Sequence, residues 1–194
     1  MAVPGDDVDA LSDHSTIDYE SDHEWVFHDM AAAVKSGDVV ALDTAIDNFG
    51  GLIDEPLENN DSALHLACLY GHLPCVELLL ERGANIEIKD TDDALPLHDA
   101  CDGAGYLDIV EFLLSRASSP ECAKRMIETM DRAGNTPLHC AASGEHVNVI
   151  RFLLSSGASP SIKNFSMETP GDLAEINSDA RRILEAAVAN SRIS

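Results

Sequence analysis

The stretch Thr136-Pro137-Leu138-His139-Cys140-Ala141-Ala142 decides how this chain folds, because similar stretches occur elsewhere in the sequence. Two earlier copies are Ser62-Ala63-Leu64-His65-Leu66-Ala67-Cys68 and Leu95-Pro96-Leu97-His98-Asp99-Ala100-Cys101, and a weaker later copy is Thr169-Pro170-Gly171-Asp172-Leu173-Ala174. The histidine position recurs at intervals of 98 − 65 = 33, 139 − 98 = 41 and 172 − 139 = 33 residues. Self-similarity with a period of this length predicts a stack of repeated supersecondary units.

A second apolar segment follows the first three copies at a constant distance. These segments span residues 71–80, 105–114 and 146–154, and Gly-Ala follows the first and the last of them shortly afterwards. Residues 33–42 fit the same pattern upstream, without the histidine. Each copy therefore predicts two helices separated by a short break.

These residues resemble the ankyrin repeat, whose motif is T-P-L-H-x-A-A followed by G-H-L-x-V-V-x-L-L-L-x-x-G-A, over residues 24–187. The resemblance implies an all-α repeat solenoid, in which each helix-turn-helix unit carries a β-turn tip. The physical chemistry agrees, because one unit cannot bury its apolar face alone and must stack on its neighbours. Pro96 and Pro137 suit the first turn of a helix, and Gly83 and Gly157 suit the residue after a helix end.

The pattern divides the chain into a tail, five units and a short end. We expect an acidic, disordered tail at 1–23 and a C-terminal tail at 188–194, because the first is rich in carboxylates and has no basic residue. The predicted units are an N-terminal cap at 24–57, repeats at 58–90, 91–131 and 132–164, and a C-terminal cap at 165–187. Ser21 with Glu24 fits a capping box opening the first helix, and the alternative is an acidophilic kinase site at Ser15 or Ser21.

The third unit departs from the pattern at two places. Residues 102–104 contain one residue too many, and residues 117–125 replace a short Gly-Ala loop. The second insertion is interpreted as a tolerated surface loop, because extra loop length costs little free energy. The alternative is a protrusion specific to a partner.

The charge of the chain excludes several classes of partner. Twelve Lys and Arg residues against 35 Asp and Glu residues give 12 − 35 = −23 at pH 7. A phosphate backbone and an anionic membrane surface are both held by basic residues, so we expect neither nucleic acid nor membrane as a partner. A basic protein suits this acidity, and so does simple solubility.

The sequence shows no basic and apolar signal segment and no apolar run of membrane-spanning length. Its five cysteines are an odd number without a C-x-x-C pair, which indicates reduced thiols rather than a disulfide framework. We therefore expect a monomer of the cytoplasm, the nucleus or both. Cys122, in the inserted loop, is the thiol that the sequence marks as reactive.

Motifs for catalysis are missing from the sequence. It has no G-x-x-x-x-G-K-[ST] loop, no G-x-S-x-G elbow and no H-E-x-x-H pair. His65, His98 and His139 share one repeat position, and the resemblance implies that each bonds to the backbone of a neighbouring turn. Histidines one repeat apart are too distant to share a metal ion, so we expect no metal, no cofactor and no enzyme activity.

The resemblance places a partner surface on the turn tips and on the exposed face of each unit's first helix. Candidate tip residues are Glu58, Asn59, Thr91, Asp92, Arg132 and Phe165, and candidate helix residues are Leu69, Tyr70, Asp99 and Asp102. Tyrosine is a typical interface anchor, and carboxylates around it suit a basic segment. The alternative is that the carboxylates only solvate this face.

Two functions follow for such a chain. The first is a non-catalytic interaction module, acting as an adaptor or as a regulatory subunit that binds a protein partner. The second is a dedicated chaperone or escort of a basic client such as a ribosomal protein or a histone. An enzyme is a distant third interpretation.

Overall fold

The computed structural model describes residues 19–48, 53–57 and 60–191, with side chains from residue 28 onward. The described part is all-helical, with eleven helices and no strand. The prediction of an all-α repeat solenoid is confirmed. Most of the predicted acidic tail lies outside the described residues.

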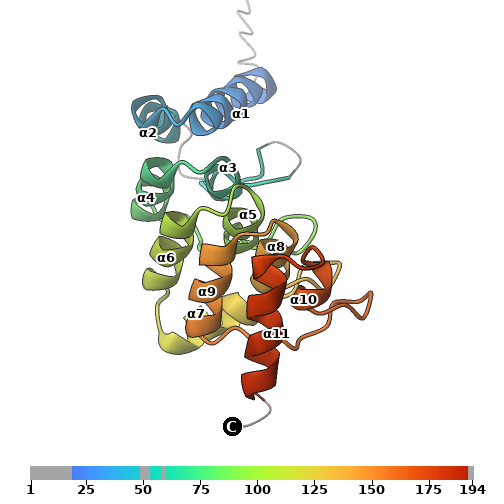
Figure 1. Cartoon of the computed structure of the whole chain (residues 1–194). Helices are drawn as coiled ribbons and strands as arrows, with labels where there is room; N and C mark the ends of the chain where they lie inside the picture. The colour runs from blue at the N-terminus through green and yellow to red at the C-terminus, as the bar shows by residue number, and fades with distance from the viewer. Residues whose placement is uncertain (1–18, 49–52, 58–59, 192–194) are drawn as a thin grey trace, which may run out of the picture.

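Ten of the helices form five antiparallel pairs, which follow one another along a single stack (Figure 1). The pairs are α1 (Tyr19–Ser36) with α2 (Val39–Asn48), α3 (Ala63–Tyr70) with α4 (Leu73–Glu81), α5 (Pro96–Asp102) with α6 (Leu107–Ser115), α8 (Pro137–Ser143) with α9 (Val147–Ser155), and α10 (Pro170–Leu173) with α11 (Asp179–Ser191). The first helix of each pair contacts the first helix of the next pair, and the second helices do the same. We call these two columns the inner and the outer helices.

The first helix begins earlier than its sequence suggests. An N-cap residue precedes the helix and has extended backbone angles. α1 begins at Tyr19, so Ser21 lies within its first turn, and the prediction of a capping box at Ser21 is wrong. At the other end of the stack, α11 runs to Ser191, beyond the predicted unit boundary at residue 187.

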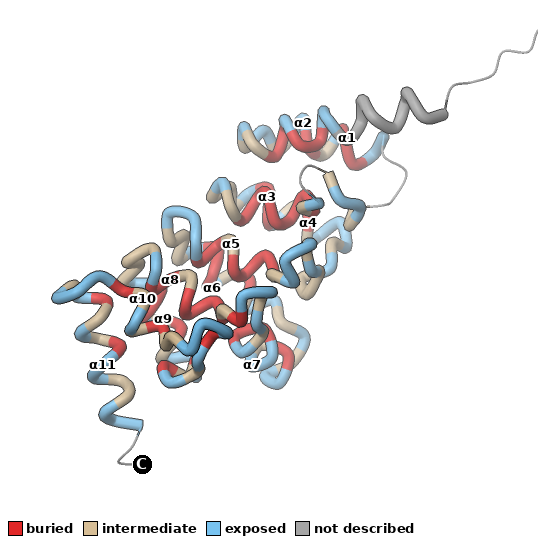
Figure 2. The backbone as a smooth tube through the Cα atoms, turned by 90° about the vertical axis from the view of Figure 1, so that its right-hand side faces the viewer, coloured by how far each residue is buried: buried red, intermediate tan, exposed pale blue. Residues whose placement is uncertain are grey.

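The core runs through the whole stack between adjacent pairs, as the buried segments in Figure 2 show. Leu64, Leu97 and Leu138 of the inner helices are almost or completely buried, and the alanines three residues after them are at 0% exposure. Burying a leucine side chain contributes about 1.5–3 kcal/mol, and a small alanine lets neighbouring helices approach closely. The repeated Leu-His-x-Ala spacing therefore produces one continuous apolar core.

The three buried histidines link each repeat to the next. Nδ1 of each ring accepts a hydrogen bond from the backbone N–H that precedes its own helix, at 3.3 Å for His65, 3.0 Å for His98 and 3.1 Å for His139. The proton therefore sits on Nε2, which donates to a carbonyl oxygen of the following unit. The acceptor is the Ala94 carbonyl for His65 and the Glu168 carbonyl for His139, both at 3.2 Å. One ring thus caps a helix and joins two repeats.

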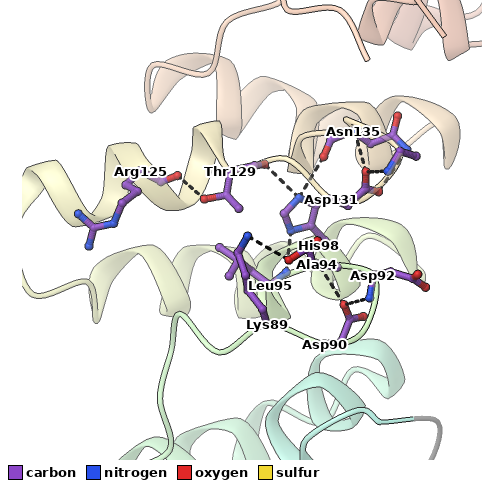
Figure 3. A network of polar contacts seen from close by, with 12 residues as sticks. Lys89, Asp90, Asp92, Ala94, Leu95, His98, Arg125, Thr129, Asp131 and Asn135 are labelled. Carbon is purple, nitrogen blue, oxygen red and sulfur yellow. Dashed lines mark hydrogen bonds and ion pairs between the residues drawn. The ribbon is translucent and has the colours of Figure 1, made fainter. Parts of the chain in front are cut away.

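His98 contacts two separate segments through one ring nitrogen, as Figure 3 shows. Its Nε2 lies 3.2 Å from two carbonyl oxygens, those of Thr129 and Asn135. Thr129 ends the inserted segment of the third unit, and Asn135 belongs to the next turn tip. His98 therefore joins the insertion and the fourth unit at one point.

A second row of contacts, not foreseen from the sequence, lies at the start of the outer helices. Nε2 of His72 lies 3.0 Å from the Lys35 carbonyl, and Nε2 of His146 lies 3.1 Å from the Asp102 carbonyl. Tyr106 occupies the corresponding place in the third unit, and its ring lies against Gly71, where a Cβ atom would come within 2.2 Å of the ring. Gly71 is also left-handed at φ 78°, so glycine suits this position in two ways.

The insertion at 117–125 is a helix rather than a surface loop. α7 (Pro120–Glu128) begins after Ser119, whose hydroxyl accepts the Cys122 N–H at 3.1 Å, and it contacts α6 and α8. Cys122, Met126 and Ile127 of this helix are buried. The interpretation as a tolerated loop is wrong, because these apolar side chains extend the core below the third unit. It also buries Cys122, which the sequence had marked as reactive.

The role of α7 in stability can be tested with Met126→Ala. Met126 is completely buried, so its truncation removes apolar contacts and leaves a cavity. We expect the free energy of unfolding, measured by urea denaturation, to fall by about 2–5 kcal/mol. Lys124→Ala on the exposed face of the same helix is the control and should change it by less than about 0.5 kcal/mol. Equal effects of the two substitutions would contradict a packed α7.

The histidine links predict a stability that falls in mild acid. Burial lowers the pKa of all three rings from the ordinary value of 6.5. Below that value the unfolded chain takes up protons that the folded chain excludes, so the free energy of unfolding should decrease from pH 7 towards pH 5. His98→Gln keeps an N–H donor but cannot titrate, and we expect a flatter pH dependence of the urea midpoint. The exposed His28→Gln should leave the wild-type slope unchanged.

Candidate functional site

Three similar turns project beside the inner helices and form the tips of the units. In each turn the first backbone N–H donates to the carbonyl four residues later, at 3.1 Å in residues 90–94 and at 2.9 Å in both 131–135 and 164–168. The Leu57 N–H donates to the Asp61 carbonyl at 2.8 Å. The Asp90 and Asp131 carboxylates each accept two further N–H groups of their own turn at 2.7–2.8 Å. These carboxylates shape the turns and are occupied internally.

The last three tips are joined to one another. The Arg132 N–H donates to the Asp92 carbonyl at 2.6 Å, and the Phe165 N–H donates to the Ala133 carbonyl at 3.0 Å. The Asn164 side-chain amide donates to the Asn135 side chain at 3.0 Å. The tips therefore present one connected edge to a partner rather than independent loops.

The candidate tip residues lie along this edge, except for the first two. Glu58 and Asn59 lie outside the described residues. Thr91, Asp92 and Arg132 are exposed, and the Arg132 guanidinium lies 3.6 Å from the Asp92 carboxylate. Phe165 is 72% exposed, with its ring beside Gly134. An exposed aromatic ring on a fixed turn is available for contact with another protein.

The candidate helix residues lie at the ends of α3 and α5. Tyr70 is 43% exposed, Leu69 is half-buried and Asp102 is exposed. The two helix ends adjoin, because a Cβ atom at Gly103 would lie 2.9 Å from the Leu69 carbonyl. The end of α3, at Leu69 and Tyr70, therefore adjoins the end of α5, at Asp102 and Gly103.

Asp99 differs from the other candidates because it is half-buried and one of its carboxyl oxygens is inaccessible to solvent. Its Oδ2 atom is buried and has no hydrogen-bond partner among the described residues. Burial first, and then the neighbouring carboxylates of Asp61, Asp90 and Asp102, raise the pKa of this carboxyl from 3.8 to about 8. The repeat position predicts an exposed side chain, but this carboxyl has a buried oxygen without a hydrogen-bond partner.

A shallow hollow lies between the fourth inner helix and the last two tips. It has a volume of about 310 Å³, and its lining includes Asp102, Cys140, Ser143, Asn164 and Glu168. Larger hollows of about 430 Å³ and 340 Å³ lie at the two ends of the stack, against α1 with α2 and against α10 with α11. The hollow beside Asp102 belongs to the same face as Tyr70 and the tips.

The thiols are placed for packing. All five cysteines are free, and Cys68 and Cys101 are completely buried. Burial raises the pKa of both thiols and that of Cys140, which keeps them protonated. The Cys122 thiol, 3% exposed, donates to Glu87 at 3.4 Å. A buried, protonated thiol is a poor nucleophile.

Most basic side chains of the described part are engaged with acids. Arg82 pairs with both Asp43 and Asp47, and Arg125 binds Glu87 through two N–H groups at 2.7 Å. Shorter-range pairs join Lys89 to Asp93, Lys124 to Glu128, Arg181 to Glu185 and Arg182 to Asp179. Internal pairing leaves a large excess of carboxylates on the surface.

The described residues show neither a metal-binding cluster nor a helix able to cross a membrane. They contain no group of three or more His, Cys, Asp or Glu side chains arranged to hold a metal ion. Among the helices described, none combines the length and the apolar character needed to cross a bilayer.

Two family descriptions match the chain. "Ankyrin repeats (3 copies)" matches residues 30–122, and "Ankyrin repeats (many copies)" matches residues 97–154. Together they extend from the middle of α1 almost to the end of α9.

Curated relatives match only over their repeat segments. The chain is 36% identical over 97 residues to the human transient receptor potential cation channel subfamily A member 1, covering 49% of this chain and 8% of the channel. It is 38% identical over 112 residues to the Drosophila melanogaster ankyrin repeat and KH domain-containing protein mask, covering 58% and 3%. It is 36% identical over 111 residues to the Bos taurus ankyrin repeat and SOCS box protein 3, covering 56% and 20%. The chain thus spans a fifth or less of these relatives.

Asp99 predicts an unusual dependence of stability on pH. Its folded pKa of about 8 lies above the unfolded value of 3.8, so between these values the folded chain holds a proton that the unfolded chain releases. The free energy of unfolding therefore falls as the pH rises from 3.8, and the contribution of this proton is lost once the pH has risen through 8. We expect Asp99→Asn to raise the free energy of unfolding by about 1–3 kcal/mol at pH 8–9. The gain should shrink as the pH falls below the unfolded value of 3.8, where Asp99 becomes protonated in both states. Urea denaturation at several pH values measures this, and a destabilised variant at pH 9 would contradict it.

Proposed function

Because the chain belongs to the ankyrin-repeat family, we propose that it captures a protein partner on the surface formed by its turn tips and inner helices. Ankyrin repeats are generally protein–protein interaction modules. The proposed role is non-catalytic, that of an adaptor or a regulatory subunit. We call the proposed surface the inner face and define it by Leu69, Tyr70, Asp102, the 90–94, 131–135 and 164–168 tips, and the hollow between them.

The observation that carries this proposal is that exposed aromatic side chains lie on or beside turn tips that are hydrogen-bonded to one another. Phe165 and Tyr70 are both exposed, and the hydrogen bonds between tips hold the edge before any partner arrives. A preformed surface loses little conformational entropy on binding. Aromatic side chains are also the groups that most often dominate binding energy at interfaces.

A second candidate function is the escort of a basic client, such as a ribosomal protein or a histone. The charge of −23 and the carboxylates of Asp92 and Asp102 on the inner face favour it. Complementary charge accelerates association and makes it sensitive to salt, whereas an apolar interface resists salt. Salt sensitivity therefore separates the escort from an adaptor or regulatory subunit.

The remaining attributes belong to the same proposal. The protein acts as a monomer in the cytoplasm, the nucleus or both, without a metal or cofactor. Its partner is a protein rather than nucleic acid or a membrane, which accords with an excess of acids that repels phosphate groups.

The inner face can be tested with the double substitution Tyr70→Ala and Asp102→Lys. Both side chains are exposed, so the melting temperature should change little while partner capture from a soluble lysate falls at least about tenfold. The measurement is a pull-down washed at low and at moderately high salt, with bound proteins quantified by mass spectrometry. A partner lost at higher salt identifies the escort function, and a salt-resistant partner identifies an apolar interface.

Glu111→Lys on the outer helix α6 is the matched control. Glu111 is exposed on the opposite column of helices, and the substitution changes the charge as Asp102→Lys does. Capture should be unaffected by Glu111→Lys. If the double variant captured partners as well as the wild type does, the inner face would be the wrong surface.

A further inference from the structure

One repeat position carries a carboxyl where its equivalents carry apolar or thiol groups. The residue after the buried histidine is Leu66 in the second unit, Asp99 in the third and Cys140 in the fourth. Leu66 is 3% exposed, and the pKa of the Cys140 thiol is raised by burial. The site is therefore built for an uncharged side chain, and the third unit places an acid in it.

Two acids of the neighbouring tip have partners, but the Oδ2 atom of Asp99 has none among the described residues. Asp90 accepts two N–H groups of its own turn at 2.8 Å, and the Asp92 carboxylate lies 3.6 Å from Arg132. The Oδ2 atom of Asp99 is the buried side-chain atom without a partner among the described residues. Leaving a buried polar atom unpaired costs about 1–3 kcal/mol, and more when the group is charged.

Among the described residues, the ionisable groups that interact electrostatically with Asp99 are acids and thiols, Cys101 of its own helix included. Asp61 and Asp90 lie towards it from two neighbouring tips, and Asp102 lies one turn further along α5. From the flanking inner helices come Cys68 of α3 and Cys140 of α8. A cation is the one species that would stabilise all of these carboxylates together.

We propose that Asp99 is the anchor of a subsite that receives a lysine or arginine side chain of the protein partner, with Asp61, Asp90 and Asp102 around it. This inference rests on the proposed function and names the chemistry that its inner face recognises. An ammonium or guanidinium group donates the hydrogen bond that Oδ2 lacks, and the long aliphatic stem of either side chain packs against Leu69 and Tyr70 at the adjoining helix end.

Such a subsite links binding to proton release. The raised pKa leaves Asp99 mostly protonated at neutral pH, and an arriving cation favours its ionised form. The carboxyl proton passes to solvent, and a charge-assisted bond to Oδ2 forms. Binding at pH 7 therefore releases protons, and less so well above pH 8.

The test uses the full chain with fluorescent hexalysine and hexa-arginine peptides as probes. Asp99→Leu installs the residue of the second unit, and Asp99→Asn keeps the shape of the carboxyl. Asp93→Asn is the control, since it removes one exposed acid from the neighbouring tip. Fluorescence anisotropy should show the Kd for the peptides rising about tenfold in both Asp99 variants and less than about twofold in Asp93→Asn. Thermal unfolding should show both Asp99 variants folded and at least as stable as the wild type.

A second readout needs no variant. The side-chain carboxyl ¹³C signal of Asp99, followed by NMR against pH, should titrate at a lower pH when hexalysine saturates the protein. Equal losses of affinity in the Asp99 and Asp93 variants, or an unmoved Asp99 titration, would overturn the subsite. Partner capture that depends on Tyr70 and Asp102 would then still stand, so failure of the subsite is distinguishable from failure of the proposed function.

Discussion

The repeat stack depends on a buried histidine that occurs at the same position of three units and connects each of them to the next. Each ring accepts a hydrogen bond from the N–H at the start of its own helix and donates one to a carbonyl of the next unit, as His98 does to Asn135. The bridge works only with a neutral ring, which burial ensures by lowering the pKa. Because the bridge sits between the core and the turn tips, it fixes how far each tip projects beside the inner helices. The position of the connected tip edge is therefore set by buried contacts behind it.

Local repetition explains what could be predicted from the sequence. The Leu-His-x-Ala spacing predicts the stacked helix pairs, since the same residues must meet equivalent neighbours in every unit. α7 escaped prediction because its apolar residues Cys122, Met126 and Ile127 are few and alternate with charged ones. The second row of contacts escaped because it mixes histidine with Tyr106. The burial of Asp99 depends on helices from the two adjacent units, which no local pattern reports.

The carboxylates of the protein differ in whether they have a hydrogen-bond or ion-pair partner within the fold. Many carboxylates have internal partners, as Asp90 and Asp131 do within their turns and Glu87 does with Arg125. Asp99 stands apart, because its position costs stability and offers no internal compensation. Residues that destabilise a fold without local benefit are commonly found where a protein meets its ligand, since stability and activity trade against each other at such places.

The route of the chain through α7 has a consequence for variation and engineering. After α6 the chain forms α7 and reaches Thr129. The carbonyl oxygens of Thr129 and of Asn135 in the following tip both lie 3.2 Å from Nε2 of His98. The inserted helix is thus tied at its C-terminal end to His98. The inner helices α5 and α8 contact each other as other neighbouring inner helices do. The helix α7 therefore adds to the third unit on the side of the outer helices while the contact between α5 and α8 is kept. The α6–α7 junction is therefore a suitable place to attach a fluorophore or an affinity tag, because it lies away from the inner helices and the turn tips.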